Sequence, residues 1–203
     1  MPKDGTATRE RILQTAERLM IEQGYNATSL DQVIAESSSS KGAFFHHFGS
    51  KSDLGLQLVE RYAANDLVYL DAGLTAVAGI DAPVDRLLEF VRFYEDRADD
   101  LMSEQSGCLY ATVLAERELT GSEVNDLVAA ATLAWRRAVA ELVAAALEAR
   151  GGGVAEDVDP DVVADHLYTT FEGGFILCRT FDDPSAMRSQ LRVFRQLLQA
   201  LLR

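Results

Sequence analysis

The residues best suited to chemistry gather in one short segment, "SKGAFFHHFGSK", at positions 40–51. Four of its side chains carry nitrogen donors for phosphates or base edges: Lys41, His46, His47 and Lys51. Gly42 and Ala43 have almost no side chain, so a helix backbone can come close to a base pair there. Taken alone, the two histidines also fit a solvated pair on a surface helix. The segment therefore favours nucleic-acid recognition over catalysis.

The rest of the chain offers little catalytic chemistry. It has three histidines and lacks metal-ligand spacing, a nucleophile elbow and a phosphate-binding loop. Its two cysteines, Cys108 and Cys178, form no CxxC motif and fit a reducing compartment. We expect no catalytic residue, metal site or cofactor. Two alternatives to nucleic-acid recognition stay open. One is a helical-bundle enzyme or small-molecule-binding protein, and the other is an interaction module that kept the fold but lost DNA binding.

The composition indicates a soluble globular protein. The chain has 203 residues, of which 48% are hydrophobic and 25% charged. It contains no apolar run long enough to span a membrane and no stretch of signal-peptide type at its N-terminus. We therefore expect a cytoplasmic protein that does not contact a membrane.

The charge is unevenly distributed along the chain. The net charge of −13 by itself argues against nucleic acid as a partner. However, residues 1–51 contain six basic and six acidic side chains, so the whole excess of negative charge lies in residues 52–203. The asymmetry indicates that the two parts have different functions.

The pattern of helix signals shows which elements must position the donor segment. A first helix is predicted from Thr8 to Gln23, where Gly24 ends it. Thr28 opens "TSLD", a capping box for a second helix ending near residue 36. Ser50 opens "SKSD", the box of a longer helix. A helix of about two turns fits between them, at residues 40–48.

On a helical wheel, this short helix has an apolar side and a donor side. Phe44 and Phe48 fall together, whereas Gly42, Ala43 and His46 fall opposite them. Two helices joined by a turn of three or four residues, the second anchored by aromatic side chains, are typical of a helix-turn-helix. In this interpretation residues 37–39 form the turn and Ser40 caps the short helix.

The remaining chain predicts further helices and no strands. They are expected at 83–98, around "CLYATVLAERE", at 123–149, and after the Asp-Pro pairs at 159–160 and 183–184. The last helix has an apolar stripe suited to packing against another helix, either of its own chain or of a partner chain: Met187, Leu191, Phe194, Leu198 and Leu201. The predicted fold is all-α, with a three-helix helix-turn-helix domain at 1–50 and a bundle of about six helices at 51–203.

Residues 8–54 resemble the DNA-binding domain of the TetR (tetracycline-repressor-like) family of bacterial regulators. The resemblance lies in "ILQTAERLMIEQGYNATSLDQVIAESSSSKGAFFHHFGSKSDL" and runs without a gap. It implies that Thr28, Ser40, His47 and Lys51 contact phosphates. It also implies groove-facing roles for Lys41, Gly42, Phe45 and His46, and Ser39 and Ala43 complete the expected DNA-binding set.

The chain departs from the family pattern in the turn and the short helix. Where the family has Ala-Gly-Val, this chain has Ser37, Ser38 and Ser39. Ser38 is then expected in the left-handed conformation that glycine adopts more easily. Phe45 replaces a tyrosine whose hydroxyl reaches a phosphate, so contact with a thymine methyl group is the expected use of its ring.

The resemblance further implies a ligand-responsive regulator, expected to act as a repressor, that binds a palindromic operator in double-stranded DNA. Homodimerisation is expected through the last two helices, about 160–202, with an unidentified small-molecule effector in the bundle. Candidate contacts to the effector come from apolar faces and polar positions: Met102, Cys108, Trp135, His166, Phe171 and Phe175. Cys108 is either a buried apolar residue or a redox or electrophile sensor, because a thiol near a helix N-terminus is activated.

Overall fold

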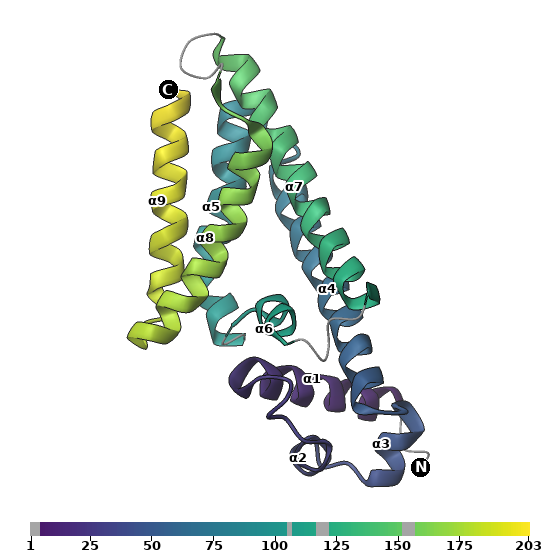
Figure 1. Cartoon of the computed structure of the whole chain (residues 1–203). Coiled ribbons are helices and arrows are strands. Elements are labelled where there is room, and N and C mark those ends of the chain that lie inside the picture. Colours follow the sequence, from purple (N-terminus) through teal and green to yellow (C-terminus); the bar gives the residue numbers. More distant parts are fainter. Residues whose placement is uncertain (1–4, 105–106, 117–121, 152–156) are drawn as a thin grey trace. The chain divides into compact units, whose positions relative to one another are not determined.

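The computed structural model describes residues 5–104, 107–116, 122–151 and 157–203, and these ranges contain only helices as regular elements (Figure 1). The predicted all-α fold is confirmed. The helices are α1 (Gly5–Gln23), α2 (Leu30–Glu36), α3 (Lys41–His47), α4 (Lys51–Val77), α5 (Pro83–Glu104), α6 (Leu109–Ala115), α7 (Ser122–Arg150), α8 (Pro160–Phe181) and α9 (Ser185–Leu202).

The chain divides into two compact units. Residues 1–65 and 106–129 form unit 1, and residues 66–105 and 130–203 form unit 2. This division differs from the expected boundary between residues 50 and 51. The reason is that α4 and α7 each supply residues to both units, and that α6, far along the chain, belongs with the N-terminal helices.

Unit 1 is built on α1, which packs against α2, α3 and α6 (Figure 1). The core side of α1 is fully apolar, with Ile12, Leu13 and Ala16 inaccessible to solvent. Arg61 on α4 forms ion pairs with Glu10 and Glu17 of α1. Burial raises the pKa of the Glu17 carboxyl above its usual range, against the opposing effect of Arg61. These pairs hold the first helix to the start of α4.

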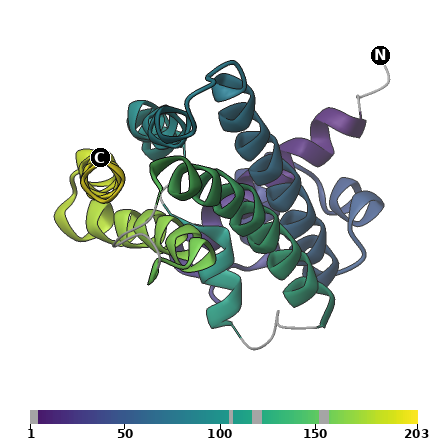
Figure 2. The same ribbon diagram turned by 90° about the horizontal axis from the view of Figure 1, so that it is seen from above.

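In unit 2, α9 lies along α5 and α8 (Figures 1 and 2). Its buried stripe is the predicted one except at its end, where Leu202 is buried in place of Leu201: Met187, Leu191, Phe194, Leu198 and Leu202. A side chain at Gly174 of α8 would overlap Met187, so glycine permits this close approach. The stripe therefore packs within its own chain.

Ion pairs join α5 to α9 along their length. Glu95, only 5% exposed, accepts hydrogen bonds from Arg192 at 2.9 Å and from Arg195 at 2.7 Å. Asp99 pairs with Arg188 nearer one end of the helices. Arg203 pairs with Asp85 at 2.6 Å near the other. Because removing one partner of a buried pair leaves a buried charge, Glu95 is the critical member of this set.

An aromatic cluster centred on Tyr94 of α5 forms the other part of the unit 2 core. The Tyr94 hydroxyl donates to the Tyr69 carbonyl of α4 at 3.1 Å. Its ring packs at 5.3 Å from Trp135 and 5.7 Å from Phe171, measured between ring centroids. A side chain at Gly73 would overlap the Tyr94 ring, so this glycine makes room for it.

Candidate nucleic-acid interface

The turn between α2 and α3 consists of consecutive serines held by their own hydrogen bonds. Ser38 has φ 51°, the left-handed conformation predicted from the sequence. The buried Ser37 hydroxyl donates to Ser39 Oγ at 3.0 Å. The Ser39 backbone N–H donates to the Ile34 carbonyl at 3.0 Å. Local polar contacts thus replace the apolar contact that the family pattern makes at Ser39.

The N-terminus of α3 is capped as predicted. The Ser40 side chain accepts a hydrogen bond from the Ala43 backbone N–H at 3.1 Å, which satisfies one of the free donors of the first turn. Phe44 and Phe48 are inaccessible to solvent, with ring centroids 5.4 Å apart. The predicted cap and both predicted anchors are confirmed, and together they fix which side of α3 faces outward.

The side of α3 opposite these anchors is exposed. Lys41, Gly42, Phe45 and His46 are exposed, and the Phe45 ring is 54% accessible although it is apolar. Lys41 Nζ lies 2.9 Å from Asp31 Oδ1 of α2, and more than 70% of each side chain is accessible. Such an exposed pair contributes about 1 kcal/mol or less, so the ammonium group exchanges partners easily.

His47 stands at the edge of this surface, half-buried beside His46. The two ring centroids are 5.0 Å apart. Partial burial lowers the pKa of His47 below its usual range, and the neighbouring charges of His46 and Arg9 act in the same direction. The imidazole is therefore neutral at pH 7, when it can act as a hydrogen-bond donor through one ring nitrogen.

Contacts from α1 fix the turn in a way that the sequence did not reveal. Arg11 Nε donates to the Ser37 carbonyl at 2.7 Å, at the end of α2. Arg18 forms ion pairs with Glu36 of α2 and with Glu22 of its own helix. A bond to a backbone carbonyl has no sequence spacing of its own, so no pattern pointed to Arg11.

The prediction for Thr28 is wrong in one respect, since the N-cap of α2 is Ser29. The Ser29 side chain accepts a hydrogen bond from the Gln32 backbone N–H at 3.1 Å. Thr28 is inaccessible to solvent, and its hydroxyl donates to the Gly24 carbonyl at 2.8 Å. The signal was present, because Ser29 and Gln32 also form a capping box. The phosphate contact expected of Thr28 stays a prediction.

The start of α4 forms the other edge of the surface. The Ser50 side chain caps the helix by accepting from the Asp53 backbone N–H at 3.1 Å, as predicted. The Asp53 carboxylate accepts from the Gly49 N–H at 2.7 Å. Hydrogen bonds from Gln57 and then from Gly49 hold the pKa of Asp53 below its usual range. Lys51 Nζ lies 4.2 Å from the centroid of the Tyr25 ring, beside α3.

The candidate effector residues do not form one group. Trp135 and Phe171 meet in the aromatic cluster, Phe175 is buried on α8 and Met102 is half-buried on α5. His166 is exposed, with its ring 5.5 Å from that of Phe194. Unit 2 contains a cavity, but none of these candidate residues lines it.

Cys108 belongs to unit 1, whereas the other candidate effector residues belong to unit 2. It is 8% exposed at the N-cap of α6, where its side chain makes no capping hydrogen bond. Cys178 is also buried, and neither thiol is part of a disulfide. The structure is compatible with both interpretations of Cys108, and its sensor role stays a prediction.

No helix in the described part of the chain is long and apolar enough to cross a membrane. Within those same residues, no three side chains of the metal-binding types come together as ligands.

A capped, aromatic-anchored α3 that follows α2 after a short turn defines a helix-turn-helix protein, here joined to a helical C-terminal region. Residues 12–58 match the family model of the bacterial regulatory proteins of the tetR family. Residues 83–194 match that of the tetracyclin repressor-like C-terminal domain. The chain belongs to the TetR family of transcriptional regulators.

Similar proteins agree with this assignment along nearly the whole chain. The transcriptional regulator AcuR of Cereibacter sphaeroides is 25% identical over 94% of this chain and 85% of its own length. The transcriptional repressor DhaR of Mycobacterium sp. is 23% identical over 84% of this chain and 82% of its own length. A crystal structure of a TetR regulatory protein from Rhodobacter sphaeroides has a TM-score of 0.74 at 24% identity, covering 93% of this chain and 97% of that one.

Proposed function

We propose that this protein is a homodimeric repressor that a small molecule releases from a palindromic operator. The observation that carries the proposal is the exposed side of α3, where donors stand beside Gly42 and Ala43 while Phe44 and Phe48 anchor the opposite side. Small residues let the helix backbone enter the major groove, and the donors then reach base edges and phosphates. The similarity to AcuR and DhaR, named as a regulator and a repressor, supports it.

Each residue of the surface has a proposed role. Base edges are contacted by Lys41 and His46, and a thymine methyl group by Phe45. Phosphates are contacted from the edges of the surface and from the capped helix starts, where backbone N–H groups are available: Ser29, Ser40, His47 and Lys51. Ser29 takes the place expected of Thr28 because it is the N-cap of α2. Ser39 supports the turn.

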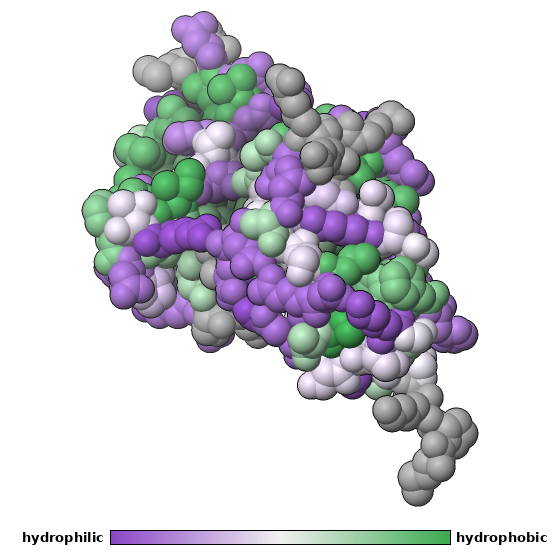
Figure 3. Space-filling view, turned by 60° about the horizontal axis from the view of Figure 1, so that its bottom comes forward, coloured by the Kyte–Doolittle hydropathy of each residue, from purple (hydrophilic) through white to green (hydrophobic). Residues whose placement is uncertain are grey.

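The homodimer is proposed to form through α8 and α9. Their outward sides carry exposed apolar residues that the stripe facing α5 does not use: Val162, Ile176, Phe181, Val193 and Leu197. Apolar surface gathers at the left of Figure 3, the side on which α8 and α9 lie in Figure 1. A two-fold interface there places two recognition helices on half-sites about one helical turn apart, ~34 Å.

Release requires an effector that prefers the form of the dimer that does not bind DNA. A ligand with equal affinity for both forms shifts nothing, however tightly it binds. Unit 2 is the proposed location of the effector, and the cytoplasm is the proposed location of the protein.

The test is binding of the full-length protein to a palindrome from the DNA upstream of its own gene, measured by fluorescence anisotropy. The double variant Lys41→Ala, His46→Ala is expected to bind about 100-fold more weakly, since each lost base contact costs about 1–3 kcal/mol. Circular dichroism and sedimentation check that the variant remains folded and dimeric. A folded wild-type dimer that binds no DNA at low salt contradicts the proposal, and so does a variant with wild-type affinity.

A further inference from the structure

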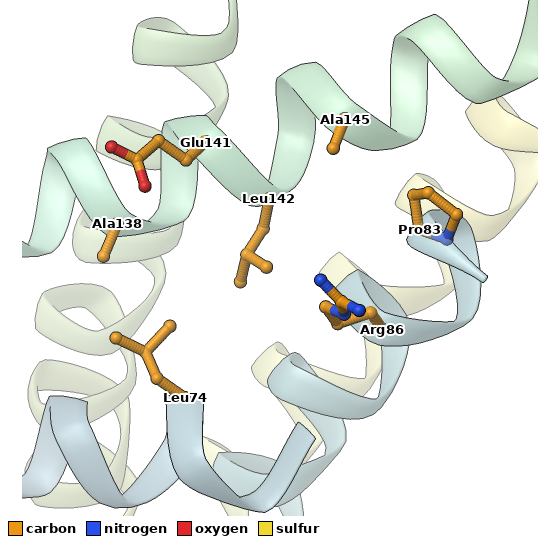
Figure 4. Close-up of a pocket in the computed structure, with 7 residues that line it drawn as sticks. All are labelled: Leu74, Pro83, Arg86, Ala138, Glu141, Leu142 and Ala145. Carbon is orange, nitrogen blue, oxygen red and sulfur yellow. The ribbon is translucent and has the colours of Figure 1, made fainter. Parts of the chain in front are cut away.

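Unit 2 contains a cavity of about 210 Å³ between α4, α5 and α7 (Figure 4). Five of its seven lining residues are apolar: Leu74, Pro83, Ala138, Leu142 and Ala145. The other two, Arg86 of α5 and Glu141 of α7, are charged. Apolar walls with a few placed polar groups are typical of small-molecule sites.

The Arg86 guanidinium is held in place but only partly used. Its Nε donates to the Ile80 carbonyl at 2.6 Å, in the connection between α4 and α5. No carboxylate of the described residues forms an ion pair with Arg86. By contrast, Arg92 on the same helix pairs with Glu89 at 3.0 Å, and the arginines of α9 pair with α5. Both Nη groups of Arg86, with four N–H donors, therefore remain available to a ligand.

The size of the cavity limits the ligand. Its volume is about seven times the share of one water molecule in the liquid, and it lies below the range of drug-sized pockets. The occupant is therefore a small molecule. The free donors of Arg86 form a planar fork that matches a carboxylate.

Glu141, although exposed, disfavours a second negative charge on the α7 side of the cavity. Figure 4 shows the Glu141 carboxylate and the Arg86 guanidinium on either side of Leu142, with Leu74 across the cavity. A ligand carboxylate at Arg86 thus has its apolar part against the two leucines. A second carboxylate on the ligand would enter apolar surroundings or approach Glu141, and both are unfavourable.

We propose that this cavity binds a short apolar monocarboxylate, held by the two Nη groups of Arg86 with its hydrocarbon chain against Leu74 and Leu142. The binding site is independent of DNA recognition. The role of this ligand as the effector rests on the proposed function.

The test is isothermal titration of full-length protein, without DNA, with hexanoate, 1-hexanol and adipate. Hexanoate is expected to bind, whereas hexanol lacks the charge and adipate carries a second one, so both bind at least about tenfold more weakly. Arg86→Met keeps the apolar stem and is expected to weaken hexanoate binding by about tenfold or more. Arg92→Met, the same change at an exposed position of α5, is the matched control and is expected to keep wild-type affinity.

A second variant, Ala138→Leu, reduces the cavity without touching Arg86, so the test does not depend on Arg86→Met folding. It is expected to lose hexanoate binding while unfolding at the wild-type temperature. The proposal is overturned if the wild type does not bind hexanoate, or if it binds hexanol as tightly as hexanoate. It is also overturned if Arg86→Met binds hexanoate as tightly as the wild type does. Operator binding is measured separately. Hexanoate binding without DNA binding refutes only the proposed function, and DNA binding without hexanoate binding refutes only this site.

Discussion

Two basic helices of this protein, α9 and α3, use their cations in opposite ways. By charge alone α9 is the stronger candidate for a nucleic-acid partner, since it carries Arg188, Arg192 and Arg195 and no acidic residue. Yet all three guanidinium groups pair with carboxylates of α5. The shorter α3 has one lysine and two histidines, and it exposes Lys41 and His46 beside glycine and alanine while His47 is half-buried.

The difference shows that a binding surface is identified by cations that can exchange their partners for a ligand, and not by the number of cations on a helix. Glu95 is 5% exposed and held by two arginines, so exchange of its partners would leave a buried charge. The pair between Lys41 and Asp31 lies in solvent and costs little to open. The net charge of −13 is misleading for the same reason, because it averages surfaces with different functions.

Among the substitutions that test this difference between α9 and α3, the one at Glu95 has the largest expected effect. Glu95→Gln leaves two arginines without their carboxylate and is expected to lower the free energy of unfolding by about 3 kcal/mol. DNA affinity of the folded variant should equal that of the wild type. Urea unfolding measures the first quantity and anisotropy the second. The control is Glu89→Gln, which removes an exposed pair with Arg92 and should cost about 1 kcal/mol or less.

The same residue gives a pH dependence with a defined sign. Burial of Glu95 opposes ionisation, but hydrogen bonds from Arg195 and Arg192 outweigh it and hold the pKa of the carboxyl below its usual range. The pair therefore stabilises the fold at neutral pH, and this stabilisation is lost as the pH falls through the lowered pKa. Glu95→Gln should lack this component of acid denaturation. Equal acid sensitivity in both proteins would contradict the assignment.

A substitution in the turn between α2 and α3 is expected to have a smaller effect, and to increase the stability of the fold. Ser38 has a positive φ that disfavours any residue with a Cβ. Ser38→Gly is expected to raise the free energy of unfolding by about 0.5–1 kcal/mol, with unchanged or slightly tighter DNA binding. Ser38→Ala keeps the unfavourable conformation and should bring no gain, so it serves as the control. A loss of stability in Ser38→Gly would show that the serine side chain stabilises the turn.

The smallest expected effect concerns His47. Because its lowered pKa leaves it neutral at pH 7, protonation of His47 at acidic pH adds a positive charge beside the proposed phosphate contact. DNA affinity should rise as the pH falls from about 7.5 to 5.5, and His47→Gln should reduce that rise by about threefold. Parallel pH profiles of wild type and variant would exclude His47 from the interface.

Sequence patterns were reliable where the structure is local. The Ser40 cap, the Phe44 and Phe48 anchors and the left-handed Ser38 each depend on neighbours within a few residues, and all are present. The error at Thr28 also has a local origin, because two capping-box patterns are offset by one residue there. The Ser29 side chain caps α2, whereas the Thr28 hydroxyl is bonded to the Gly24 carbonyl.

The features that were not predicted depend on residues far apart in the sequence. The apolar stripe of α9 was visible, but no pattern told whether it meets α5 or a partner chain. Arg11 reaches a carbonyl 26 positions away, and Glu95 meets arginines about 100 positions away. The cavity at Arg86 arises from three helices whose lining residues share no spacing. Such contacts depend on tertiary packing, which the local periodicity of the sequence does not reveal.

The central claim is that the cations of α3, and not those of α9, contact DNA. The most direct test is the salt dependence of operator affinity for the wild type, Lys41→Ala and Arg192→Ala, plotted as log K against log salt concentration. Arg192 is half exposed, so its removal should be tolerated. Lys41→Ala is expected to lower the operator affinity about tenfold or more, the cost of one lost base contact, while Arg192→Ala keeps the wild-type affinity and the wild-type slope. Weaker binding with a reduced slope in Arg192→Ala, together with wild-type affinity in Lys41→Ala, would contradict the account.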